Sequence, residues 1–352
     1  MGDLLKEMSM LNGIPGNERQ VRHFMKKEME KYGEISFDNL GSIIAKKVGK
    51  EDGPRIMVAG HMDEVGFLAT TITEDGYLKF TAAGGWWSQV MLAQQMVVTT
   101  SSGKEIRGVI GAKAPHILTE DERKKPVDIK DMYLDLGVKD KEAAEKLGIK
   151  PGDMITPFIQ VEEMSDPKYL LGKAWDNRVG CAAAIDVLKN LQDKKHDNVY
   201  YGVGTVQEEV GLRGAKTSAF KINPDIGIAL DTTIAYDFPK GSKETVLGKG
   251  VGIMFKDSSM VGHKGLRDFV LKIADEEEIP YQLTQLERGG TDGGAMHLNG
   301  IGAPTIALCL PVRYLHSHTS IVHRDDYDAM VKLVTKLIEK LDSDAVHKIT
   351  YE

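Results

Sequence analysis

Apolar runs of strand length alternate with amphipathic stretches of helical period in the first and last parts of the chain. The strand-like runs cover residues 35–46, 55–59, 199–206, 225–230, 281–286 and 304–310. Apolar residues recur at helical spacing in residues 17–29, 179–191, 264–277 and 325–341, and a shorter helix is expected after Arg213. In the helix at 179–191, small residues at Gly180 and at 182–184 favour close packing on a sheet. This alternation predicts an α/β fold.

The pattern of apolar and polar residues changes between residues 67 and 163. Short β-rich runs at 77–81, 96–100, 105–112 and 132–136 are separated by Gly and Pro, and only residues 141–147 show a helical pattern. Such spacing is typical of a small barrel or sandwich. We therefore predict one α/β domain formed by residues 1–66 and 165–352, split by an inserted β domain at 67–164 that is expected to mediate dimerisation or oligomerisation.

Composition narrows the possible partners. The chain has 352 residues, 41% of them hydrophobic, and a formal charge of -7. No Lys/Arg run interleaved with aromatic residues is present, so nucleic acid is not expected as a partner. Cys181 and Cys309 both lie in apolar segments, which favours a reducing, cytoplasmic setting. No stretch reaches the roughly 18 apolar residues of a membrane span, and the N-terminus lacks the apolar core of a signal peptide.

Polar residues with metal-binding side chains follow several of the predicted strands. They are His61 and Asp63, Asp176, Glu208 and Glu209, Asp231, and either His316 or His318. In an α/β sheet, the ends of such strands are where ligands bind. Two histidines with several carboxylates suit Zn, Co or Mn, and the carboxylates exceed what one ion needs. The set therefore predicts two divalent metal ions per subunit, the usual arrangement for metal-assisted hydrolysis.

Within this set, the pair of His61 and Asp63 and the pair of Glu208 and Glu209 are each expected to divide two roles between their members. A metal-bound imidazole normally donates its second N–H to a carboxylate, so Asp63 is predicted to orient His61. The alternative is that His61 is a core histidine and Asp63 a turn residue. Glu208 and Glu209 leave one strand in different directions, so one can bind metal while the other acts as a general base. An acidic pair in a loop is, taken alone, more often solvated surface.

Six motifs in order resemble those of the cytosolic metallo-aminopeptidases that include the tetrahedral (TET) peptidases and the glutamyl aminopeptidases. They are Gly60-His61-Met62-Asp63-Glu64-Val65-Gly66, Ala174-Trp175-Asp176-Asn177-Arg178, Val206-Gln207-Glu208-Glu209-Val210-Gly211-Leu212-Arg213-Gly214, Leu230-Asp231, Gly289-Gly290-Thr291-Asp292 and Arg313-Tyr314-Leu315-His316-Ser317. The resemblance runs from about residue 10 to 340.

The resemblance implies a mixed-sheet, three-layer catalytic domain with an inserted barrel-like domain, and removal of N-terminal residues from peptide substrates. It also implies a dimer-based homo-oligomer, a dodecamer. The resemblance further implies that His61 and Asp231 hold one metal, that Glu209 and His316 hold the other, and that Asp176 bridges the two. Glu208 is then the general base, and a cis peptide bond is expected at Asp176-Asn177.

Several alternatives stay open. His316 and His318 would fall on one face of a continuing strand, so spacing does not choose between them, whereas the family pattern favours His316. In the glycine-rich loop, Asp292 is a candidate to bind the substrate's α-ammonium group, and the equally good alternative is that it caps a short helix from Gly293. For the whole chain, the rival functions are a metal-dependent N-acyl amino acid hydrolase, a glycosidase using the two glutamates, and a binding protein without activity.

Overall fold

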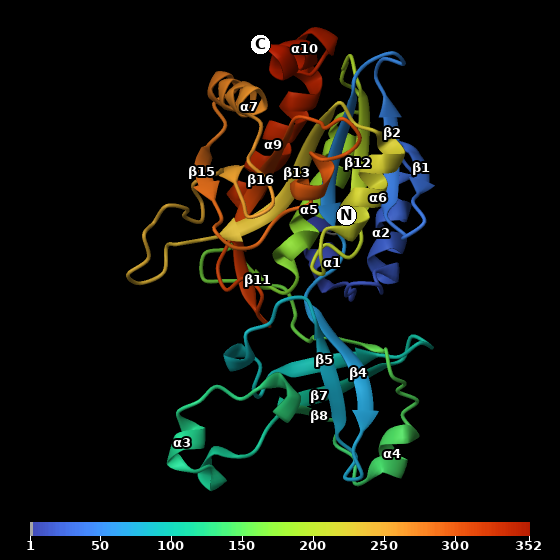
Figure 1. Cartoon of the computed structure of the whole chain (residues 1–352), viewed down its shortest axis with the longest axis vertical. Coiled ribbons are helices and arrows are strands. Elements are labelled where there is room, and N and C mark those ends of the chain that lie inside the picture. The colour runs from blue at the N-terminus through green and yellow to red at the C-terminus, as the bar shows by residue number, and fades with distance from the viewer. Residues whose placement is uncertain (1–2) are drawn as a thin grey trace.

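A mixed eight-stranded sheet forms the centre of the upper part of the molecule in the computed structural model, which describes residues 3–352 (Figure 1). In spatial order its strands are β1 (Glu34–Phe37), β2 (Ile43–Val48), β12 (Val199–Thr205), β3 (Arg55–His61), β13 (Ile226–Ile234), β16 (Thr305–Val312), β14 (Val251–Lys256) and β15 (Tyr281–Gln285). The four central strands β12, β3, β13 and β16 are parallel to one another, whereas β2 and β14 run antiparallel to their inner neighbours. The predicted mixed sheet is confirmed.

Helices cover both faces of this sheet. One face packs on α1 (Leu4–Met10), α2 (Arg19–Met29), α5 (Trp175–Asn190), α7 (Lys264–Glu276), α9 (Arg324–Lys340) and α10 (Ser343–Tyr351), and the other on α6 (Arg213–Ile222) and α8 (Gly293–Met296). Alternate residues of β3 divide between the two cores, since Ile56 and Val58 join the larger one and Met57 and Ala59 the smaller. Strands buried on both faces explain the continuous apolar runs in the sequence. The three-layer prediction is thus confirmed.

The segment between β3 and α5 forms a closed antiparallel barrel, seen below the sheet in Figure 1. Its strands, in order around the barrel, are β4 (Gly66–Ile72), β5 (Leu78–Ala83), β8 (Tyr133–Asp135), β7 (Glu105–Gly111), β6 (Gln95–Thr99) and β9 (Met154–Pro157). Short helices α3 (Glu120–Arg123) and α4 (Lys141–Glu145) and the 3-10 turns η1 (Ser88–Val90), η2 (Pro115–Ile117) and η3 (Ile129–Asp131) accompany them. The barrel has its own core, built around Phe67, Phe80, Val98 and Leu134.

A small third sheet lies where the chain returns from the barrel to the α/β part. It consists of β10 (Glu162–Glu163), β11 (Tyr169–Gly172) and β17 (Ser320–His323), all antiparallel. Because β17 follows the loop that carries His316, this sheet places that loop next to the start of α5.

Helix α5 approaches the sheet as closely as its small residues predict. A Cβ atom on Gly60 of β3 would lie 2.4 Å from the backbone of Gly180, and one on Gly180 would lie 2.5 Å from the Leu230 carbonyl oxygen of β13. Only glycine fits at such a contact. The contact brings the N-terminal turn of α5, with Asp176, against the ends of β3 and β13.

Two strand predictions were incomplete. The expected single run at 35–46 is a hairpin, because the Asp38 carboxylate accepts the backbone N–H groups of Leu40, Gly41 and Ser42 and closes a turn, with Gly41 at φ +108°. Strand β14 was not predicted at all, although residues 251–255 are apolar. Helix α2 begins at Arg19 with Glu18 as its N-cap residue.

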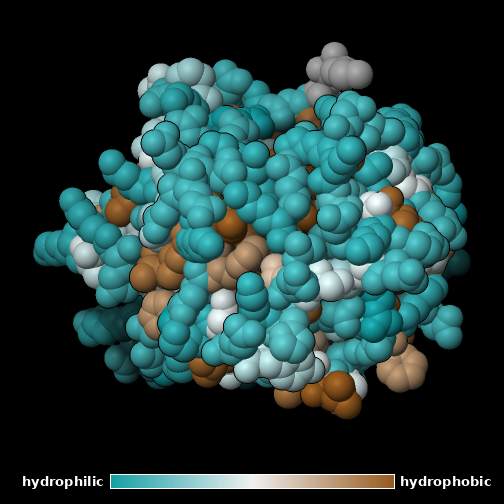
Figure 2. Space-filling view, turned by 90° about the horizontal axis from the view of Figure 1, so that it is seen from above, coloured by the Kyte–Doolittle hydropathy of each residue, from teal (hydrophilic) through white to brown (hydrophobic). Residues whose placement is uncertain are grey.

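The end of the molecule seen from above in Figure 2 is mostly hydrophilic, with hydrophobic residues in small separate patches. Among residues 3–352, no helix is long and apolar enough to cross a membrane.

Candidate metal centre

Six of the polar residues predicted from the strand ends line one cavity of about 680 Å³. His61 is the last residue of β3, Asp231 lies within β13, and Glu208 and Glu209 follow β12 in a turn where Gln207 has φ 56°. Two further ligand candidates enter from outside the sheet: Asp176 from the start of α5, and His316 from the loop between β16 and β17. All six side chains line the cavity: His61, Asp176, Glu208, Glu209, Asp231 and His316.

Asp176 lies between the two histidines. Its Oδ1 is 3.1 Å from His61 Nε2, and its Oδ2 is 3.2 Å from His316 Nε2. On the first side, His61 Nε2 is also 3.8 Å from Asp231 Oδ1; on the second, His316 Nε2 is 3.4 Å from Glu209 Oε1. The carboxylate of Asp176 thus separates two half-sites, each with one imidazole and one further carboxylate.

Glu208 is close to the first half-site, with Oε2 at 3.8 Å from His61 Nε2. Ligand atoms of His61, Glu208 and Asp231 lie within 4.8 Å of one another, and so do those of His61, Asp176 and Glu209. Distance alone therefore does not separate a metal ligand from a free base among the carboxylates. The expected cis peptide bond at Asp176-Asn177 is present.

Asp63 is fully buried beneath the site and holds the backbone of the glutamate pair. Its Oδ1 accepts the N–H of Glu208 and its Oδ2 accepts the N–H of Glu209, both at 3.1 Å. The nearest acceptor for His61 Nδ1 is the backbone carbonyl oxygen of Asp63 at 3.0 Å, whereas the carboxylate lies 3.7 Å away. Residue 63 therefore contacts His61 mainly through its main chain and the glutamates through its side chain.

A buried charge network supports the segment that follows β3. The carboxylate of Glu64 accepts hydrogen bonds from Lys173 Nζ at 2.7 Å and from Arg178 Nη2 at 3.2 Å. Arg178 also donates to the carbonyl oxygen of Met62 at 2.8 Å. Sequence reasoning missed this network, although Arg178 stands in the same motif as Asp176. Because the buried charges are paired, they fix the chain around His61 and Asp63.

The carboxylates that line the cavity are buried close together, and this raises the pKa values of three of the four. Burial raises the pKa of Glu209 to about 8, with Asp176 adding to the effect, and burial raises the pKa values of Glu208 and Asp231 well above their usual range. Burial would also raise the pKa of Asp176, but the nearby imidazoles of His316 and His61 outweigh it and lower that pKa.

The histidines respond to the same carboxylates. Burial acts to lower the pKa of His316, but Asp176 and Glu209 outweigh it and raise the value to about 9. For His61, the effect of burial is outweighed by Glu208, Asp176 and Asp63, which raise its pKa well above the usual range. When several buried carboxyl groups have raised pKa values, a bound cation stabilises their ionised form.

Buried oxygens without partners fit divalent cations as well. Within residues 3–352, Asp176 Oδ1 and Glu209 Oε1 are buried and have no hydrogen-bond partner. Nitrogen and oxygen donors without cysteine suit Zn, Co or Mn in a site that keeps positions open for substrate. The residues present therefore fit divalent metals.

His318 points elsewhere. Its Nε2 lies 2.8 Å from the carbonyl oxygen of Gln95 in the barrel and its Nδ1 lies 3.0 Å from Thr319 Oγ1, so both ring nitrogens have other partners. His316, in contrast, contacts the Gly85 carbonyl oxygen through Nδ1 at 2.9 Å and turns Nε2 to the carboxylates. The geometry favours His316, and sequence reasoning had no signal for the contact with Gly85.

Asp292 lies beside the cavity without lining it. It is 2% exposed, its Oδ2 accepts a hydrogen bond from Thr205 Oγ1, and its Oδ1 has no partner among the described residues. It precedes α8, but its side chain makes no capping hydrogen bond. Burial raises its pKa to about 6. Binding of the substrate's α-ammonium group by Asp292 stays a prediction.

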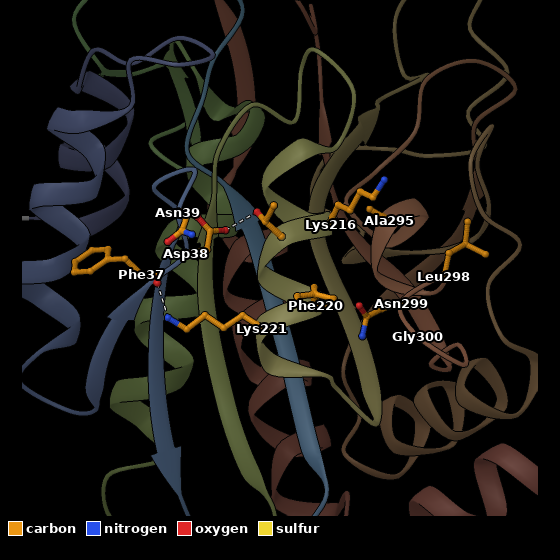
Figure 3. A pocket seen from close by; sticks show the side chains of 11 residues that line it. Phe37, Asp38, Asn39, Lys216, Phe220, Lys221, Ala295, Leu298, Asn299 and Gly300 are labelled. Atoms are coloured by element: carbon orange, nitrogen blue, oxygen red, sulfur yellow. Dashed lines mark hydrogen bonds between the residues drawn. The ribbon is translucent and has the colours of Figure 1, made fainter.

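A second cavity, of about 740 Å³, opens over α6 and α8 (Figure 3). Phe37, Phe220 and Leu298 line it with Lys216 and Lys221, and the one carboxylate there, Asp38, is engaged with Thr217 and Ser218. Its lining offers no pair of histidines or free carboxylates. The second cavity therefore lacks the set of histidines and carboxylates that surrounds Asp176.

Comparison with known proteins identifies the family of this chain. The family model described as M42 glutamyl aminopeptidase matches residues 41–333. The chain belongs to this family. It is accordingly an aminopeptidase, an enzyme that removes residues from the N-terminus of peptides.

Relatives match along nearly the whole chain. FrvX of Escherichia coli (strain K12) is 39% identical, over 98% of this chain and 97% of its own. A glutamyl aminopeptidase of Lactococcus lactis subsp. cremoris (strain MG1363) is 35% identical, over 99% and 98%. A lysyl aminopeptidase of Pyrococcus furiosus is 32% identical, over 88% and 87%. The last two relatives are thus named for different residues, glutamyl and lysyl.

Solved structures share the fold. A TET aminopeptidase from the marine sediment archaeon Thaumarchaeota archaeon SCGC AB-539-E09 superposes with a TM-score of 0.96 at 41% identity, covering 98% of each chain. The structure of PhTET1-12s, a dodecamer in the asymmetric unit, superposes with a TM-score of 0.86 at 32% identity, covering 97% of this chain and 100% of that one. The predicted fold and enzyme class are confirmed.

Proposed function

We propose that this aminopeptidase works with two divalent metal ions, of which His61 and Asp231 hold one and Glu209 and His316 hold the other, with Asp176 shared between them. The observation that carries the proposal is the position of Asp176, whose two carboxylate oxygens face the Nε2 atoms of the two histidines at 3.1 and 3.2 Å. Zn, Co and Mn all accept such donors.

Two divalent cations here would supply Lewis-acid polarisation of the scissile carbonyl and acidification of a water molecule. Glu208 is assigned the proton transfers: its carboxylate accepts a proton from the attacking water and delivers it to the departing amine nitrogen. Its burial, 8% exposed, and its raised pKa suit a group that must both take and release a proton. Asp63 acts as a positioning residue by holding the backbone of Glu208 and Glu209.

For the chain as a whole, the proposal keeps the division into residues 1–66 and 165–352 for catalysis and 67–164 for the barrel. It also includes a homo-oligomer, supported by the relative of similar fold that is a dodecamer. A cytoplasmic setting is supported by two buried, unpaired cysteines, Cys181 and Cys309.

The test combines metal analysis with two matched variants. Glu208→Gln should lower kcat on aminoacyl-anilides by about 10²- to 10⁴-fold while metal content stays at the wild-type level, because only a proton acceptor is lost. Glu209→Gln should lower metal content as well as kcat, because it removes a ligand.

The substrate panel should include N-acyl amino acids, which a related metallo-hydrolase would prefer. Wild-type protein should release aniline from aminoacyl-anilides, lose this activity in EDTA and regain it with Zn, Co or Mn. Normal turnover by Glu208→Gln, or full activity after exhaustive removal of metal, would contradict the proposal.

A further inference from the structure

A second buried carboxylate, that of Glu18, binds the turn that carries the glutamate pair. Glu18 is 6% exposed, and its Oε1 accepts the backbone N–H of Gln207 at 3.1 Å. Asp63 accepts the next two N–H groups, those of Glu208 and Glu209. Three successive backbone N–H groups of this turn are therefore bound by two carboxylates that come from different parts of the chain.

The place of Glu18 in its own segment does not account for this contact. Glu18 is the N-cap residue of α2, where a side-chain oxygen commonly accepts an N–H of the first helical turn. The Glu18 side chain makes no such hydrogen bond. Its Oε1 accepts instead the N–H of Gly16 at 2.7 Å and that of Gln207, which is 189 residues away along the chain. The side chain thus serves the turn after β12 rather than the helix that it begins.

Gln207 depends on such contacts, because its backbone is left-handed, with φ 56°. A residue with a Cβ atom keeps this conformation only where its surroundings stabilise it. The conformation of Gln207 sets the direction in which the chain continues beyond β12, and the next two side chains, Glu208 and Glu209, both line the metal cavity. The hydrogen bond to Glu18 therefore stabilises the backbone from which these two carboxylates extend.

The acceptor oxygen of Glu18 can be separated from its charge. Burial and the neighbouring Asp63 raise the pKa of Glu18 to about 7, although its hydrogen bonds with the backbone act to lower it. A neutral amide oxygen can accept the same N–H groups. Gln at position 18 would keep the oxygen and remove the charge, whereas Asp would keep the charge and withdraw the oxygen by one methylene group.

We propose that Glu18 is a positioning residue for the general base: by accepting the N–H of Gln207, it fixes the left-handed turn that directs Glu208 into the metal cavity. The inference rests on the proposed function, in which Glu208 transfers the proton. Glu18 does not line the cavity, so it acts through the turn and not on the substrate. In that function Glu209 is also held by the metal that it binds, whereas the Glu208 carboxylate is free. Loss of the Glu18 contact should therefore affect kcat more than metal content.

The test compares metal-loaded wild type, Glu18→Asp and Glu18→Gln on an aminoacyl-anilide. Glu18→Asp should fold, because Asp is a favoured N-cap residue, but its carboxylate is withdrawn from Gln207. It should lower kcat by about 10- to 100-fold, the range for a small displacement of a catalytic group, with less than about threefold change in KM and in metal content. Glu18→Gln keeps the acceptor and should retain kcat to within about threefold.

A double-mutant cycle separates positioning from a general effect on the fold. If Glu18 acts through Glu208, Glu18→Asp should cost little in a Glu208→Gln background, because residues that act as one unit are not additive. Hydrogen exchange gives a readout that does not depend on turnover. Exchange at residues 206–209 of the metal-free protein should be faster in Glu18→Asp than in wild type or Glu18→Gln, because the Gln207 N–H has lost its acceptor.

Asp326→Asn is the matched control. Asp326 is likewise buried and accepts two backbone N–H groups, those of Gly248 and Gly250, each at 2.7 Å, and it does not line the cavity. Burial raises its pKa as well, to about 6. The variant should lower stability while leaving kcat, KM, metal content and exchange at residues 206–209 unchanged.

Wild-type kcat in Glu18→Asp, or an equal loss of kcat with and without the Glu208→Gln substitution, would overturn the inference and leave the proposed function in place. So would a loss in Glu18→Gln at least as large as that in Glu18→Asp, because the acceptor oxygen would then be irrelevant. Normal turnover by metal-loaded Glu208→Gln would instead contradict the proposed function, and this inference with it.

Discussion

Asp63→Asn tests how the glutamate pair is held. In the structure the two carboxylate oxygens of Asp63 accept one backbone N–H each, from Glu208 and Glu209, at 3.1 Å. An asparagine amide keeps one acceptor oxygen but places an NH₂ group against the other N–H. The variant therefore loses one hydrogen bond to a charged acceptor, about 1.5–3 kcal/mol, and leaves a buried N–H unsatisfied, about 1–3 kcal/mol.

The two costs together predict a loss of roughly 2.5–6 kcal/mol in the free energy of unfolding. Because the same atoms position Glu208 and Glu209, metal affinity and kcat should each fall by about 10- to 100-fold, the range for residues that support metal ligands. Chemical denaturation, metal titration against a competing chelator and steady-state kinetics on an aminoacyl-anilide measure the three quantities.

Asp38→Asn is the control, because the Asp38 carboxylate also accepts backbone N–H groups, at 2.8–3.0 Å, but on the side of α6 and away from the metal centre. It should lower stability without changing metal affinity or kcat. If Asp63→Asn behaved in the same way, losing stability alone, Asp63 would be a structural residue and the positioning argument would be refuted.

Two further predictions concern the metal centre. His316→Ala should lower metal content and activity while His318→Ala, whose ring bonds Gln95, keeps both; equal metal loss in the two variants would contradict the assignment. In metal-free protein, the carboxyl pKa of Glu209 is raised to about 8 and that of the His316 imidazole to about 9, so folding takes up protons. Stability after EDTA treatment should therefore rise as pH falls from 9 toward 7, by about 1.4 kcal/mol per pH unit for each proton taken up, whereas metal-loaded protein should show no such rise; thermal melts at each pH measure the difference.

Local signals in the sequence were enough to predict that the candidate residues lie close together. His61, Glu208 and Asp231 stand at or near the ends of parallel strands, and those ends share one edge of a sheet. The small residues of α5 predict close packing on the sheet, and that packing brings Asp176 to the same edge. These signals are local in sequence, so a single chain is enough to read them.

Other parts of the site depend on contacts that no local pattern encodes. Tyr314 and His316 have φ of 62° and 53°, a left-handed backbone that non-glycine residues seldom adopt. The regular strand assumed from spacing would have placed His316 and His318 on one face, whereas the actual loop separates them.

The barrel contributes to the chemistry as well as to the architecture. The carbonyl oxygen of Gly85, just beyond β5, contacts Nδ1 of His316, and only two residues separate His61 from Glu64, where the chain turns toward β4. An acceptor at Nδ1 keeps the proton on that nitrogen and leaves the Nε2 lone pair free for a metal. A chimera that exchanges the barrel between relatives would thus also exchange the backbone that contacts His316, although the barrel supplies none of the proposed metal ligands.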